Sequence, residues 1–586
     1  MILKIPDIST RLILLIVCLL HITQARLFAM GPPENAPAPE NFEIGQPGGT
    51  LFFAQTEPKT LNPLLAMETS SKTIIGLLNG DLLHINNRSQ QTEPGAADRW
   101  SVSSDGKHYR LHLRKNLRFS DGAPCQVEDV IFSFETYLNE EMNAPQRNLF
   151  IIAGKPMVVR KIDAETIGFD LPQPYAAAER LFDGVAILPR HLLQGEIAKG
   201  MAAQMWGLAT TPQRVAGLGP FRLKKYIPGE RLILERNPYY WKRDKRGKPL
   251  PYLDEIVAIF TGTSNAETLQ FQAGETDVLN RISASDFAVL ERDQRNRRYR
   301  LVDLGPGLEF EFLFFNQNAL HADPRLLSIS RRQKWFNQTA FRQAVSSAID
   351  RESIIRLAFL GRAYPLVTSE TPSNSRWVNR EIPRPVRSLE HARQLLRKSG
   401  FTWNSAGRLQ DASGEPVGFA LSFNAGKQAQ VQTATLIQQD LKDLGIKVDL
   451  DGLESRTFMQ KILTTFRYEA ALLTLAGADT DPNAAMEFLA SGGNVHFWTL
   501  KAEAARLPAW QLEIDTLMQK QLIELDYEKR KQLYDRAQRL VWENMPVICL
   551  LSPHILVGAK DRIGNFRPGI LGNYCLWNAD QLFLRR

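Results

Sequence analysis

The amino-acid sequence predicts an α/β protein built from several lobes. The chain has 586 residues, too many for one hydrophobic core, because domains usually hold about 100–200 residues. The stretch 430–475 alternates between helical and strand patterns, as expected for a sheet covered by helices. A content of 44% hydrophobic and 23% charged residues is ordinary for a soluble globular protein. Two to four α/β lobes are therefore expected.

The first 29 residues have the order of an export signal. Lys4 and Arg11 precede the apolar run Leu12–Leu20, and the small residues Ala25 and Ala29 follow it. The run is short for a bilayer span, so a membrane anchor is the second interpretation. The cysteine inside the run lacks a small residue before it, which argues against a lipid anchor. No later stretch reaches about 18 unbroken apolar residues, so a soluble exported protein is expected.

Residues 30–48 are rich in proline and poor in large apolar side chains, which predicts a disordered leader. Only Cys125, Cys549 and Cys575 lie beyond the signal. A bridge between Cys549 and Cys575 and a pair of buried free thiols are both open.

Hairpins and helices alternate through the first half of the chain. Thr50–Thr56 is a strand candidate, and Asp105-Gly106 signals a hairpin turn before a strand of alternating apolar residues, Tyr109–Leu113. A helical stripe follows over Val127–Leu138. In a second hairpin, Pro228-Gly229 suits the centre of a type II turn.

The second half contains the clearest α/β unit. A helical stripe runs from Phe341 to Ile349, and Asp350 can cap the helix after it. Further on, a helix stopped by Gly445 leads into a strand, a second helix and the apolar strand Tyr468–Leu475. Such an unbroken apolar run indicates a strand that is covered on both faces.

The loop after that strand, AGADTDPNAAMEF (476–488), holds the strongest candidate site. Ligands of open α/β sheets collect at the carboxyl ends of strands, where Asp479 and Asp481 lie. Either carboxylate can meet a ligand cation. For Asp481, which precedes a proline, a helix-capping role is the alternative.

Other classes of function find little support in the residues. No GxSxG, HExxH, CxxC or GxxxxGK[ST] motif is present, so no catalytic residue, metal ligand or cofactor site is assigned. The formal charge of +8 is mild for this length. The basic cluster 292–300 lacks the interleaved aromatic residues of a base-stacking platform, so no nucleic-acid partner is expected.

Four stretches together resemble the large periplasmic solute-binding proteins of family 5, the oligopeptide and dipeptide binders that serve ABC transporters. The resemblance covers the chain from about Gly48 onward, and its segments keep the family's order. They are GAADRWSVSSDGKHYRLHLRKNLRFSDGAPCQVEDVIFSF (95–134), GLGPFRLKKYIPGERLILERNPYYW (217–241), FLFFNQNAL with FRQAVSSAIDRESII (312–320 and 341–355), and AGADTDPNAAMEFL (476–489).

The resemblance implies a class II periplasmic-binding-protein fold of cluster C, with two α/β lobes, a hinge and an additional smaller domain. In this expectation the first lobe combines residues 49–86, 206–305 and 546–586. The smaller domain spans 87–205, and the second lobe spans 306–545. The hairpin around Gly217, Gly219 and Pro220 is expected to act as scaffold near the crossover between the lobes.

The resemblance also implies how a ligand is held. The lobes close on a solute, most often a peptide, and the aspartate matching Asp479 pairs with its α-ammonium group. Further candidates for ligand contact complete the expected site: Thr69, Asn316, Asn494, Phe497 and Trp498. Where peptide binders often carry an aromatic residue before the loop, this chain has Leu475-Ala476-Gly477, which predicts a differently shaped pocket wall.

The expected protein is a periplasmic monomer that delivers its solute to membrane permease subunits of an ABC importer. A non-peptide solute such as an oligosaccharide, a metal complex or haem is the main alternative, because the family also takes up such ligands. A ligand sensor on the same fold is a second alternative, and an exported hydrolase is the weakest.

Overall fold

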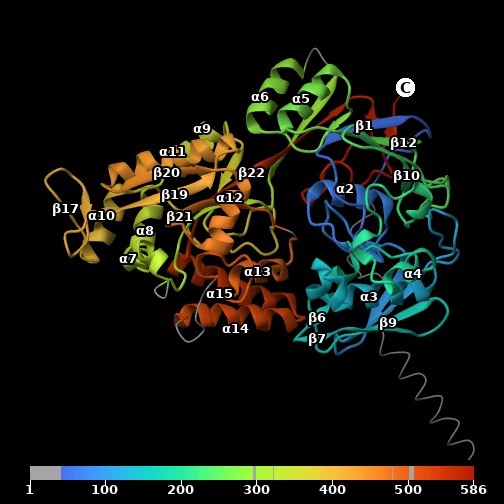
Figure 1. Ribbon diagram of the computed structural model, residues 1–586, viewed down its shortest axis with the longest axis horizontal. Coiled ribbons are helices and arrows are strands. Elements are labelled where there is room, and N and C mark those ends of the chain that lie inside the picture. Colours follow the sequence, from blue (N-terminus) through green and yellow to red (C-terminus); the bar gives the residue numbers. More distant parts are fainter. Residues whose placement is uncertain (1–40, 295–297, 321–322, 478, 501–506, 586) are drawn as a thin grey trace, which may run out of the picture.

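A single strand of 14 residues, β22 (Val547–Lys560), joins the two halves of the molecule (Figure 1). Its C-terminal part pairs with β13 (Val278–Leu279) and β14 (Tyr299–Pro306). Its N-terminal part pairs with β15 (Phe310–Phe315) and β16 (Ala363–Pro365). The result is one sheet with the strand order β10-β11-β12-β1-β13-β22-β15-β21-β19-β20, in which β22 belongs to both lobes.

The computed structural model describes residues 41–294, 298–320, 323–477, 479–500 and 507–585. The predicted export signal, residues 1–29, and the first part of the predicted leader lie outside the described residues. Among the residues that are described, no helix has both the length and the apolar character that a membrane crossing requires.

The first lobe contains β13, β14 and the strands at one edge of the sheet, where the predicted hairpin lies. Its remaining elements are β1 (Thr50–Gln55), β10 (Phe221–Ile227), β11 (Arg231–Arg236), β12 (Glu255–Phe260), α2 (Thr69–Leu78), α5 (Ser264–Ala273) and α6 (Ala284–Asp293). β10 and β11 pair antiparallel, and Gly229 takes the positive φ of +70° that its turn position requires. The predicted hairpin is therefore confirmed.

The hairpin glycines have a different task from the one expected. A Cβ on Gly217 would lie 2.2 Å from the carbonyl oxygen of Leu78, and one on Gly219 would lie 2.4 Å from the Leu78 carbonyl carbon. These glycines allow close packing against the end of α2. The strand that follows them, β10, is the edge strand of the sheet, and four strands separate it from β22, so their expected placement near the crossover between the lobes was wrong.

A small domain, defined here by one four-stranded sheet with α3 and α4, packs against the first lobe (Figure 1). Its elements are β4 (Ala97–Val102), β5 (His108–Leu113), β8 (Val158–Lys161), β9 (Thr166–Asp170), α3 (Val127–Leu138) and α4 (Arg190–Ala198). One continuous core contains Phe53 of the first lobe together with Phe134 and Phe169 of this domain. Because the core runs across them, the boundaries at 87 and 205 stay predictions.

The second lobe is a sheet covered by helices. Its strands are β15, β21 (Ala470–Leu475), β19 (Gly418–Asn424) and β20 (Lys447–Leu453), and its helices are α7 (Leu327–Phe336), α8 (Thr339–Ala348), α9 (Arg351–Ala358), α10 (Leu389–Lys398), α11 (Gln428–Asp443), α12 (Ser455–Gln460), α13 (Met486–Leu489), α14 (Ala509–Ile523) and α15 (Tyr527–Asn544). The Asp350 side chain accepts the Ser353 N–H at 3.0 Å and so caps α9 as predicted. Gly445, with φ +87°, follows α11, and the helix–strand unit of 430–475 is confirmed.

The second half of the predicted leader is ordered rather than disordered. Residues 41–48 run along the C-terminal segment, where the Glu43 N–H donates to Asn565 Oδ1 at 2.8 Å and Asn565 Nδ2 donates back to the Glu43 carbonyl at 2.8 Å. Gly45 is buried beside Tyr252 and Phe583. These contacts come from residues more than 200 positions away in the chain, and the composition of residues 30–48 alone does not reveal them.

The three cysteines beyond the signal are all buried free thiols. The alternative of a Cys549–Cys575 bridge is therefore wrong for this structure. Burial raises the pKa of Cys549 to about 12, although the nearby Arg351 opposes the shift.

Glu311 is a buried carboxyl group on β15, beside the strand that both lobes share. Its side chain is 1% exposed, one oxygen has no partner, and the other accepts the Thr474 hydroxyl at 3.1 Å. Burial raises the pKa of Glu311 to about 7, against the hydrogen bond of Thr474 and the charge of Lys427. The folded chain thus binds this proton more tightly than the unfolded chain, and stability falls as the pH rises from about 4.5 to about 7.

Glu311→Gln should therefore stabilise the protein at pH 8 by about 1–3 kcal/mol and have little effect at pH 5, where the wild-type carboxyl is protonated. Urea unfolding midpoints at the two pH values measure this difference. Glu309→Gln is the matched control: although burial opposes it, Arg281 holds the pKa of Glu309 below its ordinary value, so this change should destabilise at pH 8. An equal effect of Glu311→Gln at both pH values would show that the pKa of Glu311 is not raised in the folded protein.

Candidate functional site

The candidate loop begins where β21 ends, beside the segment that crosses from the first lobe to the second. The Gly477 N–H donates to the Leu308 carbonyl at 3.1 Å, and Leu308 lies between β14 and β15. A Cβ on Gly477 would lie 2.7 Å from that same carbonyl oxygen. A side chain at position 477 would therefore clash with the crossing segment. The hydrogen bond of Gly477 holds the loop against that segment.

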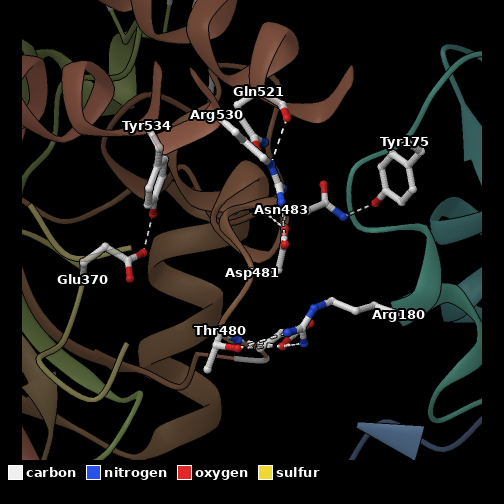
Figure 2. A network of polar contacts seen from close by, with 10 residues as sticks. Tyr175, Arg180, Glu370, Thr480, Asp481, Asn483, Gln521, Arg530 and Tyr534 are labelled. Carbon is white, nitrogen blue, oxygen red and sulfur yellow. Dashed lines mark hydrogen bonds and ion pairs between the residues drawn. The ribbon is translucent and has the colours of Figure 1, made fainter. Parts of the chain in front are cut away.

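Asp479 forms an ion pair with Arg180, which comes from the small domain. Figure 2 shows Arg180 extending from the small domain toward Thr480. Arg180 lies in a short 3-10 helix, η3 (Ala178–Phe182). Its guanidinium group donates to Oδ1 of Asp479 and, at 3.2 Å, to the hydroxyl of Thr480. The Thr480 N–H donates to the same carboxylate oxygen at 2.6 Å. The side chains of Asp479 and Arg180 remain 25% and 21% exposed, so the pair lies between the two bodies and within reach of solvent.

Asp481 is held differently. It is buried, and its two oxygens accept two hydrogen bonds from Arg530, at 2.7 and 2.6 Å. Arg530 also donates to the carbonyl and side-chain oxygens of Gln521, at 3.0 and 2.9 Å, and its guanidinium lies 4.9 Å from the Trp377 ring centre. Asp481 accepts the Asn483 N–H at 2.9 Å, at the start of η9 (Pro482–Ala485). The capping alternative is thus confirmed for Asp481.

Two further contacts bring the small domain against the second lobe. The amide of Asn483 donates to the hydroxyl of Tyr175 (Figure 2), and the Ala176 N–H donates to the Leu522 carbonyl at 2.7 Å. Tyr175, Ala176 and Arg180 lie within six positions of one another. One short segment of the small domain therefore makes both the polar contacts and the ion pair to the second lobe.

Carboxyl groups outnumber guanidinium groups in this network. The carboxyl groups are those of Asp479, Asp481 and Glu370, and the guanidinium groups are those of Arg180 and Arg530. Burial raises the pKa of Asp479, and the charge of Asp481 adds to the rise against the pull of Arg180. Burial likewise raises the pKa of Glu370 despite hydrogen bonds from Tyr534 and Asn374. A further cation at this place would be stabilised by the unbalanced carboxyl groups.

The other predicted contact residues are not brought to this network. Asn316 is 0% exposed, and its amide donates to the carbonyls of Phe466 and Tyr468, at 3.0 and 2.8 Å. Phe497 and Trp498 are buried in the core of the second lobe. Packing and internal hydrogen bonds hold these three side chains in this structure, and their contact with a ligand stays a prediction.

Asn494 and Thr69 are exposed. The Asn494 amide donates to Glu487 at 3.0 Å, and Thr69 begins α2. The contacts of the described residues bring neither side chain to Asp479, so their roles stay predictions. Sequence reasoning missed Arg180 and Tyr175, which are far from the loop in the chain and carry no motif.

Two α/β lobes that share a strand, with a charged network between them, define a two-lobed solute-binding protein. The chain belongs to the bacterial extracellular solute-binding proteins, family 5, whose middle region matches residues 91–497. The resemblance stated from the sequence is thereby confirmed. A probable ABC transporter-binding protein of Deinococcus radiodurans is 27% identical over 541 residues, which cover 88% of this chain and 89% of that protein.

Solved structures show the same fold. The oligopeptide-binding protein AppA of Bacillus subtilis, in complex with a nonapeptide, matches with a TM-score of 0.72 at 21% identity, covering 93% of this chain and 100% of that one. NikA of Brucella suis, in complex with Fe(III)-EDTA, matches with a TM-score of 0.74 at 22% identity, covering 92% of this chain and 100% of that one. The predicted α/β fold is thus confirmed.

The two loop aspartates should differ in their effect on stability. Asp481→Asn leaves the buried Arg530 without its full counter-charge and should cost about 3–5 kcal/mol of unfolding free energy. Asp479→Asn alters a pair that is partly exposed and should cost no more than about 1 kcal/mol. Urea denaturation of both variants measures the difference, and similar losses would contradict the distinction between a structural and an exchangeable carboxylate.

Proposed function

We propose that the chain is the exported solute-binding component of an ABC importer, that it captures a peptide between its two lobes and that it delivers the peptide to membrane permease subunits. The observation that carries the proposal is Asp479, a mostly buried carboxyl group between the lobes in a network with more carboxyl than guanidinium groups. The similarity to an ABC transporter-binding protein and to a nonapeptide-binding fold supports it.

The α-ammonium group of a peptide is complementary to the Asp479 carboxylate, because it carries a positive charge and three hydrogen-bond donors. A buried ammonium is tolerated only beside a counter-charge that completes its hydrogen bonds. The backbone of an extended peptide offers donors and acceptors at regular intervals, so one anchored terminus suits a binder of many sequences. Contacts made only in the closed form would then shift the lobes toward closure.

Arg180 occupies the position that the ligand ammonium would take. Because the Asp479–Arg180 pair is partly exposed, its net contribution is on the order of 1 kcal/mol. An ammonium enclosed by both lobes gains stronger, charge-assisted hydrogen bonds from the same carboxylate. The ligand can therefore replace Arg180, which serves as the counter-charge of Asp479 while no ligand is bound.

The proposed location is the periplasm, and the proposed working form is a monomer. The signal-like order of residues 1–29 and the extracellular character of the family support export. Both lobes and the small domain come from one chain, so the enclosure needs no second copy. A transport protein and a ligand sensor would enclose the solute in the same way. Binding to permease subunits would distinguish transport from sensing.

A solute with a carboxylate or other anionic group is the second candidate. The guanidinium of Arg180 presents a fork of donors that suits such a group. NikA, whose structure holds Fe(III)-EDTA, shows that the fold accommodates a ligand rich in carboxylates. In this case the ligand would take the place of Asp479 rather than that of Arg180.

Substitutions that remove the charge of Asp479 or Arg180 distinguish a peptide ligand from an anionic ligand. Asp479→Asn should weaken the binding of peptides with a free amino terminus by about 10–100-fold, because an ammonium loses its counter-charge. Arg180→Gln should strengthen their binding by about fivefold, because the internal competitor is removed. Isothermal titration calorimetry with a set of free-amino peptides measures both changes.

N-acetylated versions of the same peptides are the matched controls and should bind poorly to the wild type. Equal affinity of the wild type and Asp479→Asn would remove the ammonium role. Weaker binding by Arg180→Gln together with unchanged binding by Asp479→Asn would favour the anionic solute.

The natural ligand can be identified directly. Denaturation of protein purified from its native host releases bound solute, which mass spectrometry then identifies. Peptides are the expected result. Recovery of a single non-peptide solute at one equivalent would replace the peptide proposal with the second candidate.

A further inference from the structure

Three potential metal ligands meet beside the small domain, away from the Asp479 network. Asp81 precedes β2 (Leu83–Ile85), His84 lies on β2, and Asp183 directly follows η3. Each offers one ligand atom, and the three atoms lie within 4.8 Å of one another. In the part of the chain that the structure describes, no other group of three His, Cys, Asp or Glu side chains meets this condition.

The distances within this group suit an ion better than a hydrogen bond. Nδ1 of His84 lies 3.4 Å from Oδ2 of Asp81 and 3.4 Å from Oδ1 of Asp183. Both separations exceed the usual range of hydrogen bonds between nitrogen and oxygen. Metal–ligand bonds of about 2.0–2.2 Å in a tetrahedral zinc site place neighbouring ligand atoms about 3.3–3.6 Å apart.

Backbone groups hold both carboxylates in place. Oδ1 of Asp81 accepts the Gly184 N–H at 3.0 Å, and Oδ1 of Asp183 accepts the Ile85 N–H at 3.2 Å. Each carboxylate is thus held by the chain segment that carries another member of the group. Such outer hydrogen bonds orient the ligands of metal sites.

We propose that Asp81, His84 and Asp183 form a binding site for a divalent cation of the zinc class. One imidazole nitrogen and two carboxylate oxygens suit Zn²⁺ and its transition-metal neighbours, whereas Ca²⁺ and Mg²⁺ prefer oxygen ligands alone. The fourth position is left to water or another small donor. The side chains are 26–30% exposed, so an ion can reach the site from solvent.

The consequence of binding is structural. The cation would join β2 to the end of η3, and η3 carries Arg180 and follows Tyr175 by a few residues. It would thus fix the segment with which the small domain contacts the second lobe. This inference does not depend on the identity of the transported solute.

The test uses the full exported chain, purified without a histidine tag and freed of metal with EDTA that is then removed. Titration with Zn²⁺ in a calorimeter should show one equivalent bound with micromolar or tighter affinity, and one equivalent should raise the melting temperature. His84→Gln and Asp183→Asn should each weaken binding at least tenfold and abolish the rise in melting temperature.

His112→Gln is the matched control. His112 also lies between two carboxylates, Asp98 at 2.8 Å and Glu165 at 3.3 Å, but it contacts them through different ring nitrogens and so cannot chelate in the same way. This variant should bind Zn²⁺ like the wild type. Failure of the wild type to bind one equivalent, or affinity unchanged in both His84→Gln and Asp183→Asn, would overturn the site in favour of a protonated His84 that is paired with both carboxylates. Circular dichroism of the metal-free variants verifies that each is folded.

Discussion

The rest of the structure depends on the sharing of β22 by both lobes. Because one strand is hydrogen-bonded to β13 and β14 along its C-terminal part and to β15 and β16 along its N-terminal part, the lobes cannot separate. Relative motion of the lobes is therefore limited to rotation about the part of the sheet where strand pairing is irregular. Register shifts occur between Asp303 and Pro306 on β14 and between Glu311 and Phe312 on β15, on either side of the crossing. Such irregularities bend a strand locally, so the regular pairing of the sheet is interrupted at the crossing.

Burial decides the different tasks of the two arginines in the inter-lobe network. Arg530 and Asp481 are 4% and 8% exposed and belong to one lobe, so removing either partner leaves an uncompensated buried charge. Arg180 and Asp479 come from two bodies and keep more contact with solvent, where an ion pair contributes little. The first pair can therefore shape the loop permanently, while the second can exchange a partner at small cost in free energy.

Local patterns were sufficient to predict the elements but not the contacts between them. The Pro228-Gly229 turn, the Asp350 cap and the helix stop at Gly445 depend on neighbouring residues, and each was predicted from them. The pairing of Asp479 joins residues 299 positions apart, and that of Glu43 with Asn565 joins residues 522 apart. No local pattern records such partners.

The predictions for Asn316 and Trp498 meet the same limit. An amide or an aromatic ring suits a ligand and a core equally well, and only the surrounding chain decides between them. Asn316 donates to the carbonyls of Phe466 and Tyr468, and Trp498 packs against His496 with ring centres 3.8 Å apart. The aspartate loop was easier to find, because its place after a covered strand is itself a pattern in the sequence.

The small domain is structurally continuous with the first lobe and also contacts the second lobe. Its core is continuous with that of the first lobe, so the segment 175–183 cannot move far without disturbing both. The same segment contacts the second lobe through Ala176 and the loop through Arg180. Since Asp183 ends this segment and lies against His84, anchoring at one end sets the position of the guanidinium near the other. The counter-charge of Asp479 is therefore placed by the fold of the small domain, and rotation of the lobes about β22 decides whether the two charges meet.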